Sequence, residues 1–185
     1  MPEPAPAGNV FQEYFINVLR YKYIQYHGRA RRREYWMFCL FYLIFEVIFI
    51  VFFAMDLETL GNYLSTIFSA AILAPSVCLD IRRLHDIGKS GWWLLIFYGI
   101  KSCGLLILGW GIGKVSVAFF LPPDLIDSTE LAGIVAEGVP FIFIGTVILL
   151  AGVIISLFFF CRDSQPGENQ YGPNPKAPQE KEHKR

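Results

Sequence analysis

The sequence is short of charged residues and of paired cysteines, and each shortage argues against a class of protein. Charged residues make up 17% and hydrophobic residues 54% of its 185 positions, whereas a soluble domain carries about 25% charge. The four cysteines lie in or beside apolar segments without CxxC or finger-like spacing, which argues against a disulfide framework and a zinc site. No cleavable signal peptide is visible, because the first apolar run begins near Trp36. The composition indicates an integral membrane protein.

Four long apolar runs predict an all-α membrane protein with four transmembrane helices. The spans cover about residues 36–54, 60–79, 92–112 and 139–161. The apolar residues 115–121 are too few to span, so they are expected to extend the third helix or to dip into the interface. Pro140 is expected in the first turn of the fourth helix, where proline is tolerated. Residues 1–8 and 176–185 are predicted to be disordered, which leaves 9–175 as a single membrane domain.

The segment from Asn9 to about Tyr23 has the pattern of an amphipathic helix. Its apolar residues recur at helical spacing, and Asn9 is placed to cap its N-terminus. The apolar positions are Phe11, Phe15, Val18 and Leu19. The pattern predicts a helix that lies in the membrane interface, or one whose apolar face packs against the membrane helices of the same protein.

Basic residues are divided unequally between the two sides of the predicted membrane. The segment before the first span, the loop between the second and third spans and the C-terminal tail together carry 14 Lys and Arg residues. The two remaining loops carry one, Lys114, together with six acids. Because Lys and Arg are enriched on the cytoplasmic side, both termini are predicted to be cytoplasmic.

The sequence from Leu79 to Trp93, LDIRRLHDIGKSGWW, places a polar cluster between two apolar runs. Gly88 and Gly91 allow the backbone to reverse, and arginine and tryptophan both favour the headgroup level. The stretch therefore predicts a tight hairpin at the membrane surface.

A second basic cluster, Arg29 with Arg31, Arg32 and Arg33, lies just before the first span. Two interpretations are open. The arginines act only as a topology signal, or they bind anionic lipid headgroups, because arginine makes bidentate contacts to phosphate.

Three motifs resemble one known family. They are GRARRREYWMF before the first span, RRLHDIGKSGWW between the second and third, and GENQYGPNP after the fourth. Together they resemble the bacterial inner-membrane family called domain of unknown function 805, over roughly Tyr14 to Pro175. The resemblance implies a small multi-pass protein of the bacterial cytoplasmic membrane, and it implies neither an activity nor a catalytic residue.

All three motifs fall on the predicted cytoplasmic side, and a topology signal does not account for their histidine, aspartate and asparagine. We expect these segments to form a site for anionic headgroups or for a partner protein. Its residues are Arg29, Arg32, Glu34, Arg82, Arg83, His85, Asp86, Asn169 and Tyr171. The structural alternative is that Asp86 bonds arginines or backbone amides, while His85 bonds a carboxylate at a helix end.

Catalysis finds little support in the sequence. A metal-dependent enzyme would need further histidines and carboxylates close to His85 and Asp86. The only other histidines in the sequence are His27 and His183. Acid–base chemistry by His85 on a lipid phosphate lacks a paired nucleophile. We therefore assign no catalytic residue, metal or cofactor and expect no nucleic-acid partner.

The sequence thus predicts a non-enzymatic membrane module that contacts the lipid bilayer. Two alternatives remain, a subunit of a small oligomeric transporter or channel and a lipid-phosphate-modifying enzyme. A homo-oligomer or a membrane-protein partner is compatible with the first two classes.

Two charges lie inside the predicted spans. Glu46 follows Trp36 by ten residues and Lys101 follows Trp92 by nine. At about 1.5 Å per residue they lie roughly 15 and 14 Å deep in a core about 30 Å thick. An isolated charge there costs at least about 2.5–3.5 kcal/mol, so the two are predicted to pair or to line a wet cavity. The alternative is that Lys101 snorkels to the interface and Glu46 is protonated.

One side of the second span is small and polar, which suits close helix packing; it carries Ser65, Thr66, Ser69, Ala70 and Ala74. Gly109 and Gly113 match the GxxxG pattern in the third span, and Gly145, Gly152 and Ser156 share one face of the fourth.

Overall fold

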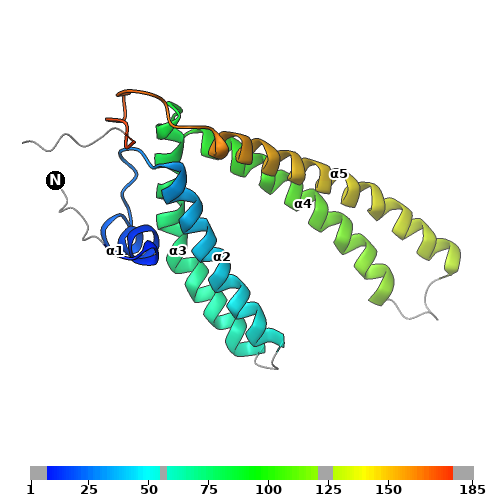
Figure 1. Ribbon diagram of the computed structural model, residues 1–185. Helices are drawn as coiled ribbons and strands as arrows, with labels where there is room; N and C mark the ends of the chain where they lie inside the picture. Colours follow the sequence, from blue (N-terminus) through cyan, green and yellow to red (C-terminus); the bar gives the residue numbers. More distant parts are fainter. Residues whose placement is uncertain (1–7, 55–57, 121–126, 177–185) are drawn as a thin grey trace, which may run out of the picture. The chain divides into compact units, whose positions relative to one another are not determined.

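The computed structural model describes residues 8–54, 58–120 and 127–176, and Figure 1 shows the helices they form. In chain order these are the π-helix η1 (Gln12–Ile16) and the α-helices α1 (Asn17–Tyr21), α2 (Arg32–Ala54), α3 (Glu58–Asp86), α4 (Trp93–Phe120) and α5 (Ser128–Cys161). No β-strand occurs in these ranges, and four of their helices, α2 to α5, are long and apolar enough to cross a membrane. An all-α protein with four membrane-spanning helices is confirmed to this extent. The predicted disordered ends, except residues 8 and 176, lie outside the described residues.

The helices are longer than the predicted spans. α3 continues seven residues beyond Leu79, α4 includes the apolar residues up to Phe120, and α5 begins at Ser128. Hydropathy locates the part of a helix that lipid covers, whereas a helix continues for as long as its backbone hydrogen bonds do. The placement of Pro140 in a first turn was wrong, because α5 starts twelve residues earlier and Pro140 lies inside it.

The described chain divides into two compact units, of which the first contains residues up to Gly91 and from Phe160 onward. Within it α2 and α3 run side by side and antiparallel (Figure 1). Phe38, Ile72 and Leu79 are buried along this pair. The unit also contains the polar ends of the first two spans, so it carries most of the predicted site.

Of the N-terminal helices, η1 packs against α2 and α1 contacts α3. Asn9 caps them as predicted, since its Oδ1 accepts a hydrogen bond from the Gln12 amide at 3.0 Å. Phe15 is 2% exposed, and its ring lies 5.2 Å from that of Phe38 and 5.5 Å from that of Phe45 on α2. Of the two predicted arrangements for this amphipathic segment, the structure therefore shows packing against the protein's own membrane helix.

The second unit, Trp92–Phe159, is the pair α4 and α5. Its contact depends on glycines seven residues apart, Gly104 and Gly111 on α4 and Gly138, Gly145 and Gly152 on α5. A Cβ atom on Gly145 would lie 2.4 Å from the Leu108 amide nitrogen, and one on Gly104 would lie 2.6 Å from that of Leu149. The two backbones therefore touch at these glycines.

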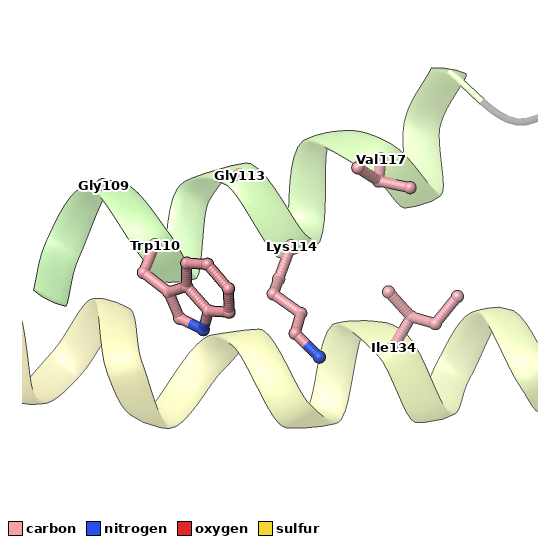
Figure 2. Close-up of a pocket in the computed structure, with 6 residues that line it drawn as sticks. All are labelled: Gly109, Trp110, Gly113, Lys114, Val117 and Ile134. Atoms are coloured by element: carbon pink, nitrogen blue, oxygen red, sulfur yellow. The ribbon is translucent and has the colours of Figure 1, made fainter.

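The GxxxG face of α4 does not take part in this contact. A Cβ on Gly109 or Gly113 would meet nothing within 4 Å. Both glycines instead line a cavity of about 500 Å³ with Trp110, Lys114, Val117 and Ile134 (Figure 2). GxxxG is a general pattern of small residues. In this protein the α4–α5 contact is made instead by the glycines spaced seven residues apart.

Candidate functional site

The last turns of α3 carry four of the predicted site residues. Arg82, Arg83, His85 and Asp86 are helical, so the helix continues past Leu79, where the predicted second span ends. The helix has 29 residues, and about 20 are enough to cross a bilayer. Its polar end is therefore free to reach the headgroup region, which is where arginine is favoured.

Gly88 ends α3 and reverses the chain. Its φ is +72°, and its amide donates to the His85 carbonyl at 3.0 Å while the Lys89 amide donates to the Leu84 carbonyl at 2.9 Å. These two bonds form a Schellman motif, which needs a left-handed residue at this position. The predicted role of Gly88 in the reversal is confirmed.

The carboxylate of Asp86 is the centre of a buried ion cluster. Its Oδ1 accepts a hydrogen bond from Arg29 Nε at 3.0 Å. Its Oδ2 accepts bonds from Arg83 Nη1 at 2.5 Å and Ser164 Oγ at 2.6 Å. The exposed fractions of the Arg29, Arg83 and Asp86 side chains are 1%, 0% and 0%. Two guanidinium groups thus share one carboxylate away from solvent, and their other donors need further acceptors.

Backbone carbonyls of the C-terminal segment supply those acceptors. Arg29 donates at 2.6–3.3 Å to the carbonyls of Asp86, Gln165, Gly167 and Gly172, and Arg83 donates to those of Phe160 and Arg162. The Gln165 amide also donates to the Asp86 carbonyl at 2.8 Å. Residues 162–172 are thereby bound across the end of α3. We call the assembly of Gly28–Arg29, Arg82–Asp86 and residues 162–172 the polar cap.

His85, Asn169 and Tyr171 join the three motifs of the cap. Asn169 Nδ2 donates to the His85 carbonyl at 2.9 Å, and the rings of His85 and Tyr171 stack with centroids 3.7 Å apart. His85 Nδ1 lies 3.2 Å from the Gly28 carbonyl oxygen, and because a carbonyl only accepts, this nitrogen is the protonated one. The structure therefore brings these predicted residues together through contacts with one another.

Glu34 and Arg82 form a second ion cluster beside the cap. Glu34 Oε1 accepts hydrogen bonds from Arg82 Nη1 and Lys22 Nζ, both at 2.9 Å. Arg82 is 2% exposed, and its Nε and Nη2 atoms are buried without a hydrogen-bond partner among the described residues. Glu34 thus connects the segment after α1 to the start of α2 and the end of α3.

The arginines at the start of α2 are arranged differently. Arg31, Arg32 and Arg33 are all exposed, and the guanidinium of Arg33 lies 5.3 Å from the ring centre of Tyr14. Nearby, the hydrogen bond from Lys176 lowers the pKa of the exposed Asp163 carboxyl. Of the four arginines predicted to bind headgroups, Arg32 is the one that faces the surroundings.

Glu46 and Lys101 each have partners within their own unit. Glu46 accepts hydrogen bonds from Ser65 Oγ at 3.0 Å and Ser69 Oγ at 2.8 Å, both on α3. Lys101 Nζ lies 4.6 Å from the ring centre of Tyr98, one turn earlier on α4. The two charged residues belong to different units, so their pairing stays a prediction.

The polar side chains of the cap mainly bind other parts of the cap. Its histidine is stacked and hydrogen-bonded as described above, and its aspartate is saturated by arginine and serine donors. Across the described ranges, no group of three or more His, Cys, Asp or Glu residues is placed to hold a metal ion. Exposed positive charge lies beside the cap, at Arg31, Arg32 and Arg33.

Two residues that close the cap were not predicted from the sequence. Ser164 and Gln165 lie in the turn-rich stretch after the fourth span, and they bind Asp86 through one side chain and one backbone amide. The main contribution of this stretch is carbonyl oxygens, which every residue has, so side-chain identity carries no signal for it. Gly167 and Gly172, which have positive φ, mark its turns in the sequence.

Comparisons with known proteins identify a family whose function is unknown. A family described as "Protein of unknown function (DUF805)" matches residues 23–173. Escherichia coli (strain K12) inner membrane protein YhaI is 30% identical over 165 residues, covering 89% of this chain and 96% of that protein. Inner membrane protein YhaH of the same strain is 28% identical over 167 residues, covering 89% and 97%. No solved structure matches.

Proposed function

Because this chain belongs to the DUF805 family, for which no activity is known, we propose a function from its own geometry. It is a multi-pass protein of the bacterial inner membrane, as the names of its relatives indicate. It acts as a non-enzymatic module that binds anionic phospholipid headgroups on the cytoplasmic side. The binding surface is the exposed arginine row Arg31–Arg33.

Two observations support a cytoplasmic position for the cap. The first is the excess of Lys and Arg in the three segments that contain it. The second is that Arg29, which precedes the first span, donates to carbonyls that follow the last span. Segments before the first and after the last span that touch must lie on the same side, which fits four spans with both termini cytoplasmic.

The exposed arginine row is the observation that carries the proposal. Arg29 and Arg83 use their donors within the protein, whereas the three residues of the row are exposed at the start of a membrane-crossing helix. Arginine binds phosphate through two parallel hydrogen bonds, and basic residues at an anionic membrane surface contribute about 1 kcal/mol each. Packing of Phe11 and Phe15 against α2 holds η1 and α1 beside the row, consistent with an interfacial position for these helices.

Replacing the row should remove lipid selectivity without unfolding the protein. We expect Arg31, Arg32 and Arg33 all changed to Gln to lower the affinity for phosphatidylglycerol about a hundredfold, from roughly 1 kcal/mol for each of the three arginines. Arg32→Gln alone should show a fraction of this loss. Native mass spectrometry of protein in mild detergent, given equal phosphatidylglycerol and phosphatidylethanolamine, measures which lipid is retained.

Lys114→Gln is the matched control. It removes a cation on the other predicted side of the membrane, so it should leave lipid retention unchanged. The melting temperature of the triple variant should equal that of the wild type, since the three side chains are exposed. A triple variant that still selects phosphatidylglycerol would refute the proposal. A wild type that retains a protein partner through the row and no anionic lipid would also refute it.

A further inference from the structure

The membrane half of the first unit contains a polar site that the headgroup proposal does not use. Glu46 lies on α2 fourteen residues after Arg32 and eight before the end of the helix. At about 1.5 Å per residue it is roughly 12 Å from that end and so lies within the span. Both of its carboxylate oxygens are engaged by hydroxyls of α3, Oε2 by Ser65 and Oε1 by Ser69.

A cavity of about 220 Å³ opens beside the carboxylate, and α2 and α3 both line it. Its walls are Glu46, Phe49, Ile50, Gly61, Asn62 and Ser65. Glu46 is the only side chain of this set that ionises in the ordinary range, and the Ser69 hydroxyl that contacts it from α3 does not. A glutamate, a serine and an asparagine thus line one cavity between two membrane-crossing helices.

The oxygen atoms of these three side chains have the chemistry of a small-cation site. Hard cations are coordinated by carboxylate, carbonyl and hydroxyl oxygens, and carboxylates within membrane spans mark ion and proton pathways. Glycine at position 61 leaves room at the cavity wall, because it has no side chain. Neither serine can neutralise the carboxylate, since a hydroxyl donates a hydrogen bond without a positive charge.

We propose that Glu46, with Ser65 and Asn62, forms an intramembrane site that binds a small monovalent cation, H⁺ or Na⁺. The ion binds from the cavity between α2 and α3 and neutralises the carboxylate. Ser69, which does not line the cavity, holds the other carboxylate oxygen in place. This function is separate from headgroup binding and uses none of the arginines of the row.

A hydrophobic carbodiimide tests the site in the full-length protein in native membrane vesicles. A protonated carboxyl in lipid adds its O–H across a C=N bond of the reagent and rearranges to a stable N-acylurea with no leaving group. We expect dicyclohexylcarbodiimide to label Glu46 at acidic pH, detected by mass spectrometry of the peptide. Labelling should decline as pH rises and disappear in Glu46→Gln.

The two cations are distinguished by adding salt at fixed pH. If Na⁺ is the ligand, NaCl should suppress labelling and choline chloride at the same concentration should not. If H⁺ is the ligand, neither salt should matter.

Two results overturn the proposal. One is an unlabelled Glu46 in the wild type at every pH at which the vesicles stay intact. The other is labelling that appears only in Lys101→Met, which would show that the predicted pairing with Lys101 already neutralises Glu46. Because labelling is read at one peptide, a partial loss of expression does not imitate either result.

Discussion

Asp86→Ala is expected to be the most damaging single substitution in the polar cap. It leaves the guanidinium groups of Arg29 and Arg83 buried without their shared carboxylate, and it frees Ser164. Removing one partner of a buried ion cluster costs about 3–5 kcal/mol. Thermal unfolding in a single detergent should show a correspondingly large drop in melting temperature.

The loss should depend on the cations that remain. Adding Arg83→Met to Asp86→Ala removes one of the two unpaired charges, so the double variant should be more stable than the sum of the two single losses predicts. Asp163→Ala, an exposed acid on the same C-terminal segment, is the control and should leave the melting temperature unchanged. Strictly additive losses, or an unchanged melting temperature in Asp86→Ala, would contradict a structural role for the cluster.

Gly145→Ala should destabilise the α4–α5 pair by about 1–3 kcal/mol, the range found when a packed site is overfilled. The added Cβ would lie 2.4 Å from the Leu108 nitrogen and 2.7 Å from its Cα, so backbone rather than a flexible side chain would have to move. Thermal unfolding in detergent again measures the loss.

Gly109→Ala on α4 is the matched comparison. Its Cβ meets nothing within 4 Å, and alanine is the better helix former by about 1 kcal/mol, so this variant should be neutral or slightly stabilised. A greater loss in Gly109→Ala than in Gly145→Ala would contradict the assigned contact and point to the GxxxG face as an interface with a second copy.

The sequence predicted the parts of this structure that depend on solvent preference or on backbone freedom. Four charge-poor runs specify four membrane helices, Gly88 specifies a reversal, and Asn9 specifies a cap, because each feature has few physical alternatives. Helix ends were predicted less well, since residues such as Arg82 and Asp86 read as loop in a hydropathy pattern although they continue α3.

The sequence did not predict which arginines are buried in ion clusters and which are exposed. Arg29 and Arg32 belong to the same basic cluster, yet one is buried against Asp86 and the other is exposed. The difference comes from where the C-terminal carbonyls lie, and no spacing along the chain encodes that. The sequence did contain a signal for the partners of Glu46, because Ser65 and Ser69 are four residues apart on one face of α3. Depth in the membrane alone predicts Lys101 as the partner instead.

The side of the membrane on which the polar cap lies is the claim that supports the headgroup proposal, and reporter fusions measure it directly. A fluorescent protein fused after Arg185 should be fluorescent, and alkaline phosphatase at the same place should be inactive. Fusions near Asp127, between α4 and α5, should behave in the opposite way. An active phosphatase after Arg185 would place the cap and the arginine row outside the cytoplasm and would contradict the account.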